Sequence, residues 1–262
     1  MTTMGLIKTS YKTVNEDYNY LRIKQLCNFG YIQKEYLEEN LLGWTLTKKG
    51  FGYIKRQLPA HHAEGYLPSN PHHDLYATAF HLGEWYGCPP ADVVLISENE
   101  LASCKSEALP ENIPLSQNHV PDGITLIEND SCRFIIGFEL EISKKANFKY
   151  TTMASYYGAN RYDVVFWCVE DMARAKAIYK AVHAKVHSEI KKHNFILFDD
   201  LKKRLWKSEI IGGQYHGQTM AAVLARYSHG ETPVEHRFPE IDWLICPHQT
   251  PRFLRPYSSK QK

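Results

Sequence analysis

The sequence lacks the features that mark several common classes of protein. Its six cysteines are scattered and form no Cys-x-x-Cys pair, so we expect reduced thiols and neither a zinc cluster nor a disulfide framework. No stretch approaches the roughly 18–20 uninterrupted apolar residues of a membrane span, and the first residues hold no apolar run typical of a secretory signal. Internal repeats and long low-complexity tracts are also absent. These absences predict a cytoplasmic protein without a membrane segment.

A large excess of one charge is missing too. The chain has 31 Lys and Arg against 29 Asp and Glu, a net charge of +2, so any surface for nucleic acid must arise from local segregation of charge. What is present suffices for a core, because 44% of the residues are hydrophobic and 13% are aromatic. A chain of 262 residues accommodates one large domain, or a large and a small one.

The first 58 residues have the pattern of a small domain of their own. Helical spacing over 14–28 ends at Gly30, alternation follows over 31–37 and 43–47, and a short helix is expected over 50–57. Helix, hairpin and helix form the second half of a winged helix, which docks on DNA through a helix and the hairpin. The alternatives are a winged helix that binds protein or forms dimers, and a plain support domain. The predicted DNA-binding residues are basic: Arg22, Lys24, Lys34, Lys48 and Lys49.

Residues 59–72, rich in proline and histidine, are predicted to be a linker, and residues 73–262 an α/β domain. Helices are expected over 73–86, 144–157, 171–193 and 218–227, and strands over 92–97, 119–127, 132–142, 162–169 and 195–198. This order is typical of helices packed on a mixed sheet.

Three carboxylates stand out in the central hairpin of this domain. A turn near residue 130 places Asp122 opposite roughly residue 138, and therefore beside Glu139. Glu141 shares a face with Glu139 because strand side chains alternate. Carboxylates so close stay ionised only with a compensating cation, and oxygen ligands suit Mg²⁺ or Mn²⁺ bound against a DNA phosphate. Lys144 and Lys149 are the candidates to stabilise the transition-state charge.

The plain alternative is a half-exposed strand, with Phe138 and Leu140 pointing inward and the glutamates outward. Against it, residues 134–136 are apolar on both faces, which indicates a central strand where uncompensated carboxylates are costly.

Several short motifs follow one another in the order seen in a known family. They are residues 26–32, Gly-Trp-Thr-Leu-Thr-Lys-Lys-Gly over 43–50, His73-Asp74-Leu75, Ser97-Glu98-x-Glu100-Leu101, Pro121-Asp122-Gly123, Glu139-x-Glu141-x-Ser143-Lys144, and Lys149-Tyr150 with Tyr157. In this order the chain resembles the replication-relaxation and MobC-type plasmid mobilisation proteins over roughly residues 20–170.

The resemblance implies a winged helix followed by a restriction-endonuclease-like domain of the PD-(D/E)XK type. It implies a relaxase that uses a divalent metal to nick double-stranded plasmid DNA at an origin of transfer, with accessory relaxosome and coupling proteins as partners. Asp122, Glu139 and Glu141 would take the metal and catalytic roles. The usual pattern of that fold ends in Asp/Glu-x-Lys, and Glu141 stands at the lysine position, so the catalytic lysine stays open between Lys144 and Lys149, or a second water replaces it.

Other points stay open as well. His73 is either a phosphate contact or the start of a helix. The commoner relaxases use a His-hydrophobic-His metal motif with a catalytic tyrosine, whereas this sequence has no His-x-His, and Tyr156 and Tyr157 fit core or DNA-stacking roles better than covalent catalysis. The two alternative functions are a non-catalytic DNA-binding accessory protein of plasmid replication or relaxosome assembly, and a restriction or repair nuclease that cuts both strands.

Overall fold

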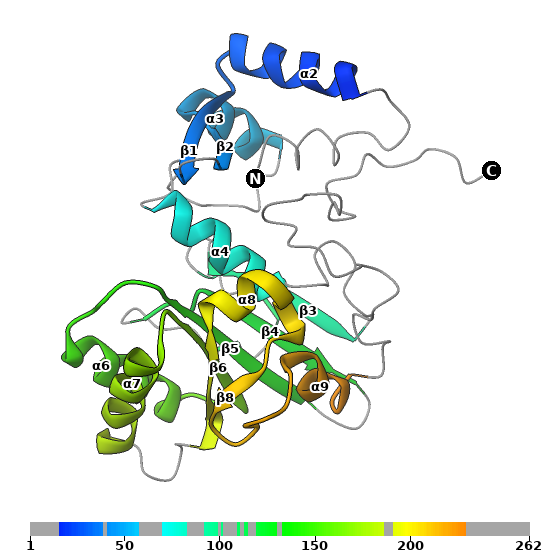
Figure 1. Cartoon of the computed structure of the whole chain (residues 1–262). Coiled ribbons are helices and arrows are strands. Elements are labelled where there is room, and N and C mark those ends of the chain that lie inside the picture. Colours follow the sequence, from blue (N-terminus) through cyan, green and yellow to red (C-terminus); the bar gives the residue numbers. More distant parts are fainter. Residues whose placement is uncertain are drawn as a thin grey trace.

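The computed structural model describes residues 16–38, 41–57, 70–82, 92–98, 101, 109–110, 113–114, 119–129, 133–185 and 191–228. Within them the chain is a mixed α/β protein with a two-stranded and a six-stranded sheet (Figure 1). None of the helices in the described part is long and apolar enough to cross a membrane.

The N-terminal elements are α2 (Glu16–Asn28), the antiparallel strands β1 (Ile32–Glu38) and β2 (Leu41–Leu46), and α3 (Lys48–Gln57). The expected order of helix, hairpin and helix is confirmed. Gly30, with φ of 70°, ends α2, and the amide of Tyr31 donates to the carbonyl of Leu26 at 2.9 Å while the amide of Gly30 donates to that of Cys27 at 2.8 Å. These paired bonds form a Schellman motif, for which glycine is the preferred residue.

The large sheet has the order β3 (Val93–Ser97), β4 (Gly123–Glu128), β5 (Arg133–Glu141), β6 (Val164–Val169), β7 (His193–Leu197) and β8 (Ile210–Gly212). The first three strands are antiparallel, β5, β6 and β7 run parallel, and β8 is antiparallel to β7. The expected mixed sheet is therefore present. β8 was not predicted, because three residues carry too little alternation to be recognised.

Helices cover both faces of this sheet (Figure 1). On one face, α4 (Pro71–Leu82), α8 (Phe198–Arg204), the 3₁₀ helix η4 (Leu205–Lys207) and α9 (Met220–Ala225) enclose one apolar core. On the other, α6 (Asn147–Ala159) and α7 (Met172–Lys185) enclose a second core. Successive side chains of β4 and β5 point to opposite faces of the sheet and are buried in one core or the other, as expected for strands covered on each side.

Several boundaries differ from the sequence-based expectation: the strand predicted over 119–127 begins at Gly123, and the helix predicted over 144–157 begins at Asn147. The helix predicted over 171–193 is too long, because β7 begins at His193, which is buried and accepts a hydrogen bond of 2.9 Å from the indole of Trp167 on β6. The last two residues of the predicted linker, 71 and 72, belong to α4, which begins at Pro71 and is capped by Asn70. Residues 59–69 lie outside the described part.

Candidate active site

Acidic side chains gather at the end of the sheet where β3 and β5 finish and β4 begins. Glu98 follows β3, Asp122 precedes β4, and Glu141 ends β5. The register pairs Gly123 with Phe138, and the amide of Asp122 donates to the carbonyl of Phe138 at 3.1 Å. The predicted placement of Asp122 beside Glu139 across the hairpin is therefore confirmed.

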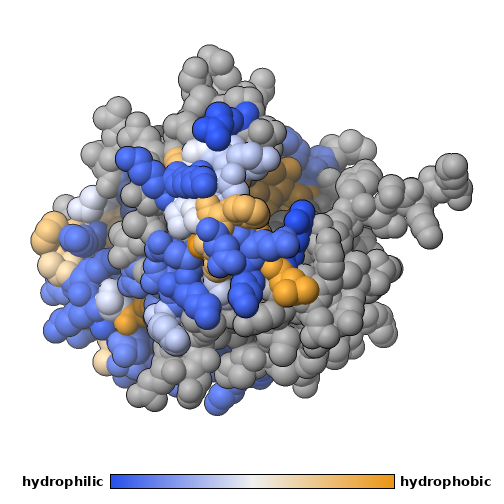
Figure 2. Space-filling view, turned by 90° about the horizontal axis from the view of Figure 1, so that it is seen from above, coloured by the Kyte–Doolittle hydropathy of each residue, from blue (hydrophilic) through white to orange (hydrophobic). Residues whose placement is uncertain are grey.

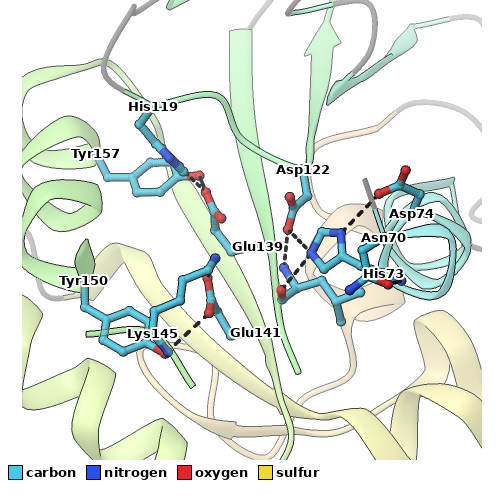
Figure 3. A network of polar contacts seen from close by, with 11 residues as sticks. Asn70, His73, Asp74, His119, Asp122, Glu139, Glu141, Lys145, Tyr150 and Tyr157 are labelled. Carbon is cyan, nitrogen blue, oxygen red and sulfur yellow. Dashed lines mark hydrogen bonds and ion pairs between the residues drawn. The ribbon is translucent and has the colours of Figure 1, made fainter. Parts of the chain in front are cut away.

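Asp122 is held by β5 on one side and by α4 on the other (Figure 3). The amide of Leu140 donates to Oδ2 of Asp122 at 2.6 Å, and Nε2 of His73 lies 3.5 Å from the same oxygen. Nε2 of His73 is also 3.1 Å from the carbonyl oxygen of Leu140, and its Nδ1 is 3.4 Å from Asp74. The hydrogen bond to Asp122 and then that to Asp74 raise the pKa of His73 to about 10, so its ring is a cation at neutral pH.

Local sequence explains how α4 presents His73. The side-chain oxygen of Asn70 accepts from the amide of His73 at 3.2 Å, as an N-cap residue does, and Pro71 occupies the first helical position. Two turns further along α4, the buried ring of His81 packs on β4 at Gly123. A Cβ at Gly123 would lie 2.4 Å from that ring, so the glycine of Pro-Asp-Gly is needed for packing rather than for chemistry.

Glu139 is buried on the α6 face of the sheet, with 1% of its surface exposed. Its Oε1 accepts from the hydroxyl of Tyr157 and lies 2.5 Å from Nε2 of His119 (Figure 3). Burial opposes the charge of His119, but the Glu139 carboxylate prevails and raises the pKa of the ring. Gly137 makes this arrangement possible, because a Cβ there would lie 2.9 Å from the ring of Tyr157.

Glu141 is fully buried and forms an ion pair with Lys145 (Figure 3). The hydroxyl of Tyr150 lies 3.4 Å from its other oxygen. Burial raises the pKa of Glu141 to about 7, against the opposing effect of Lys145. The pKa of Lys145 is raised as well, because the attraction of Glu141 outweighs the burial of the ammonium. Arg174 secures the connecting loop by donating to the carbonyl of Ser143 at 2.8 Å.

Glu98 adds a further carboxyl group to this end of the sheet. Burial, together with the charges of Asp122 and Asp74, raises the pKa of Glu98 to about 7. The site thus combines several carboxyl groups with the cations His73 and Lys145 and with His119, whose pKa is raised, which is the compensation that clustered carboxylates require.

The predicted residues fare differently. His73 contacts Asp122, and Glu139 and Asp122 lie near enough to Glu141 for their charges to raise its pKa, while Lys144 and Lys149 are exposed. The lysine that contacts a carboxylate is Lys145, which sequence reasoning missed although it lies four residues after Glu141. His119 and Tyr157 were missed as partners of Glu139, because their contacts depend on how a loop and α6 pack against β5.

The predicted DNA-binding residues lie on α2, β1 and the start of α3, and all are exposed: Arg22, Lys24, Lys34, Lys48 and Lys49. The ammonium of Lys34 lies 5.5 Å from the ring centre of Trp44. Arg22 donates to the side chain of Gln25 at 3.1 Å.

Among the described residues, no three His, Cys, Asp or Glu side chains are arranged to hold a metal ion. The metal set Asp122, Glu139 and Glu141 stays a prediction. In comparison with known proteins, the chain matches no family model, no curated protein and no solved structure.

Proposed function

We propose that the chain is a plasmid mobilisation relaxase, a DNA endonuclease that uses Mg²⁺ or Mn²⁺ to nick one strand at an origin of transfer. The observation that carries the proposal is the cross-strand pair Asp122 and Glu139 at one end of the sheet, with the Lys145 ammonium beside Glu141. Acidic groups next to a lysine are the means by which a protein positions a cation and stabilises charge on a phosphate.

The proposed ligands are carboxylate oxygens, the donor type that a hard divalent cation prefers. The contacts described above engage Oδ2 of Asp122 and Oε1 of Glu139, which leaves Oδ1 and Oε2 as the oxygens that would bind it. Mg²⁺ and Mn²⁺ prefer carboxylate oxygen and take the remaining ligands from water and phosphate. Such a cation would polarise the scissile phosphate and lower the pKa of the attacking water.

The cationic side chains supply the second part of the mechanism. Lys145 is held by Glu141, so its charge stays near the carboxylates and can stabilise the extra negative charge of the transition state. His73, protonated between Asp122 and Asp74, would donate to a phosphate oxygen in this mechanism. In this proposal Glu141, at the position where the family pattern has lysine, recruits a lysine from the following loop.

The architecture supports a PD-(D/E)XK-type domain. Pro121-Asp122 precedes one strand, Glu139-x-Glu141 ends its antiparallel partner, and α6 leads to the parallel strand β6. The N-terminal elements would act as the winged helix that docks on double-stranded plasmid DNA, and relaxosome and coupling proteins would be further partners. Tyr156 and Tyr157 are buried, and burial raises the pKa of Tyr156 to about 12, which favours structural roles over covalent catalysis.

Cleavage of supercoiled plasmid with and without a candidate origin tests the proposal. We expect open-circular product with Mg²⁺ or Mn²⁺, none with EDTA, and loss of nicking in Asp122→Asn and Glu139→Gln. Lys145→Gln should slow nicking by about 10²–10³-fold, as removal of one transition-state donor does. The neighbouring exposed residue provides the matched control, so Lys144→Gln should be close to wild type. Equal nicking by wild type and the carboxylate variants would refute the proposed nicking activity of this site.

One observation favours a second candidate, the non-catalytic DNA-binding accessory protein. Glu139 and Glu141 already have Tyr157, His119 and Lys145 as partners, so the cluster is compensated by the protein's own side chains. Origin binding without metal-dependent nicking would identify this function. Linear product would instead identify a restriction or repair nuclease.

A further inference from the structure

The N-terminal elements carry an unusual share of exposed apolar surface. Ten large hydrophobic side chains are exposed among the described residues, and six of them lie between residues 21 and 54: Leu21, Leu26, Phe29, Tyr36, Tyr53 and Ile54. Figure 2, which views the molecule from above, shows apolar side chains beside hydrophilic ones on this face. Single exposed hydrophobic residues need no explanation, but a cluster indicates a binding surface.

The turn between α2 and β1 and the helix α3 together form a line of rings, here called the aromatic row and made of Phe29, Tyr31 and Tyr53. The ring centres of Phe29 and Tyr31 are 6.4 Å apart, and those of Tyr31 and Tyr53 are 5.4 Å apart. The outer members are the accessible ones, since Phe29 is 60% exposed and Tyr53 is 47% exposed.

The backbone builds the aromatic row from distant parts of the chain. Gly30 turns the chain at the end of α2, so that Phe29 and Tyr31 flank the turn. Thr47 caps α3 by accepting from the amide of Gly50 at 3.1 Å. A Cβ at Gly50 would lie 1.9 Å from the carbonyl oxygen of Tyr31, so only glycine lets α3 approach closely enough to bring Tyr53 against Tyr31.

The charge around the aromatic row is positive. The α3 sequence KKGFGYIKRQ has four basic residues and no acidic one. The ammonium of Lys49 lies over the ring of Tyr31, 4.9 Å from its centre, and donates to the carbonyl of Phe29 at 2.8 Å, which holds a cation against the aromatic row. Lys48 and Arg56 are exposed on the same helix.

We propose that the aromatic row binds unpaired bases of single-stranded DNA. A duplex hides the faces of its bases, so exposed rings gain nothing from it, whereas unpaired bases stack on aromatic side chains for about 1–3 kcal/mol each. The surrounding lysines and arginine then bind the phosphates between the stacked bases. The aromatic row shares no residue with the carboxylate site, so single-strand binding by the row does not depend on the proposed nicking activity.

Fluorescence anisotropy in EDTA tests the proposal, since cleavage is then suppressed. The probes are labelled dT20, a duplex of the same length and rU20. Wild type should bind dT20 more tightly than the duplex, and Phe29→Leu and Tyr53→Leu, which keep apolar volume but remove a ring, should each weaken dT20 binding by about tenfold. Duplex binding should change by less than about twofold, because phosphate contacts persist.

Matched variants separate stacking from charge and from misfolding. Tyr53→Phe keeps the ring and should keep the affinity, and Tyr36→Leu removes a ring that is 79% exposed outside the aromatic row and should change nothing. Lys48→Gln should weaken both dT20 and duplex and reduce the salt dependence of each. Equal losses on dT20 and duplex in the ring variants would overturn the proposal, as would tighter binding of rU20. A concentration-dependent dimer abolished by Phe29→Leu, with no binding of dT20, would show that a second copy covers the surface.

Discussion

Two glycines of the central hairpin decide which large side chains reach the candidate site. Gly123 admits the ring of His81 from one face of the sheet, and Gly137 admits the ring of Tyr157 from the other. Each glycine lies one or two residues from a carboxylate, Asp122 or Glu139. The absence of a side chain at these positions therefore supports the placement of the acidic groups.

Gly137→Ala should destabilise the protein and disturb Glu139. The new methyl group would lie 2.9 Å from the Tyr157 ring, so the ring must move away from the carboxylate that it bonds. Overpacking of this kind costs about 1–3 kcal/mol in the free energy of unfolding, measurable by urea denaturation.

Gly52→Ala is the control for this change. It lies within α3 with nothing within 4 Å of a new Cβ, so it should stabilise the protein by about 0.5–1 kcal/mol through helix propensity. If both substitutions gave the same sign, the steric account of Gly137 would be wrong.

At the scale of elements, α4 and α6 carry the side chains that define the site. The first turn of α4 delivers His73 to Asp122, and α6 delivers Tyr150 to Glu141 and Tyr157 to Glu139. The strands supply the carboxylates, and the helices supply their partners.

Asn70→Ala should therefore reduce both stability and nicking. Loss of an N-cap side chain costs about 1 kcal/mol, and the turn that holds His73 would fray. Thermal melting and plasmid nicking measure the two effects.

Thr219→Ala removes the corresponding cap of α9, where Thr219 accepts from the amide of Ala222 at 3.2 Å. It should lower stability by a similar amount and leave nicking unchanged, because α9 contributes no side chain to the site. Parallel loss of nicking in both variants would show that stability alone, rather than the position of His73, controls activity.

At the scale of the whole molecule, two buried histidines make stability depend on pH. His81 and His193 are almost fully buried, and burial lowers the pKa of each to about 3. The unfolded chain has histidine pKa values of about 6.5 and therefore binds these protons first as the pH falls. Their contribution to stability is complete above pH 6.5 and declines toward pH 3, by about 1.4 kcal/mol per pH unit for each group.

His81→Leu should flatten this acid dependence. Neither ring nitrogen of His81 has a hydrogen-bond partner within the described part of the structure, so an apolar side chain of similar size should be tolerated at pH 7.5. Urea titrations at pH 7.5, 6.5 and 5.5 give the free energy of unfolding of each protein. The difference between variant and wild type then isolates His81, because the contributions of all other titrating groups cancel. If the free energies of unfolding of the two proteins fell in parallel with pH, a buried His81 that stays neutral would be contradicted.

The sequence by itself determined the central hairpin and the sites of its carboxylates. Alternation along the strands and the turn near residue 130 set the register, and the register brings Asp122 beside Glu139. These are local features with a period of two residues, so they can be recognised without tertiary information. The helix, hairpin and helix at the N-terminus were recognised from local signals as well, since helical spacing and strand alternation both appear in the sequence.

Only the tertiary structure decided which side chains accompany those carboxylates. Lys145 pairs with Glu141, while Glu139 is contacted by His119 and Tyr157. These contacts form because a loop and α6 pack against β5, and no periodicity in the sequence encodes that packing. The same holds for the aromatic row, which depends on the close approach of α3 to Tyr31 at Gly50. Pairing along a strand follows from spacing, whereas contacts between elements follow from how their surfaces fit together.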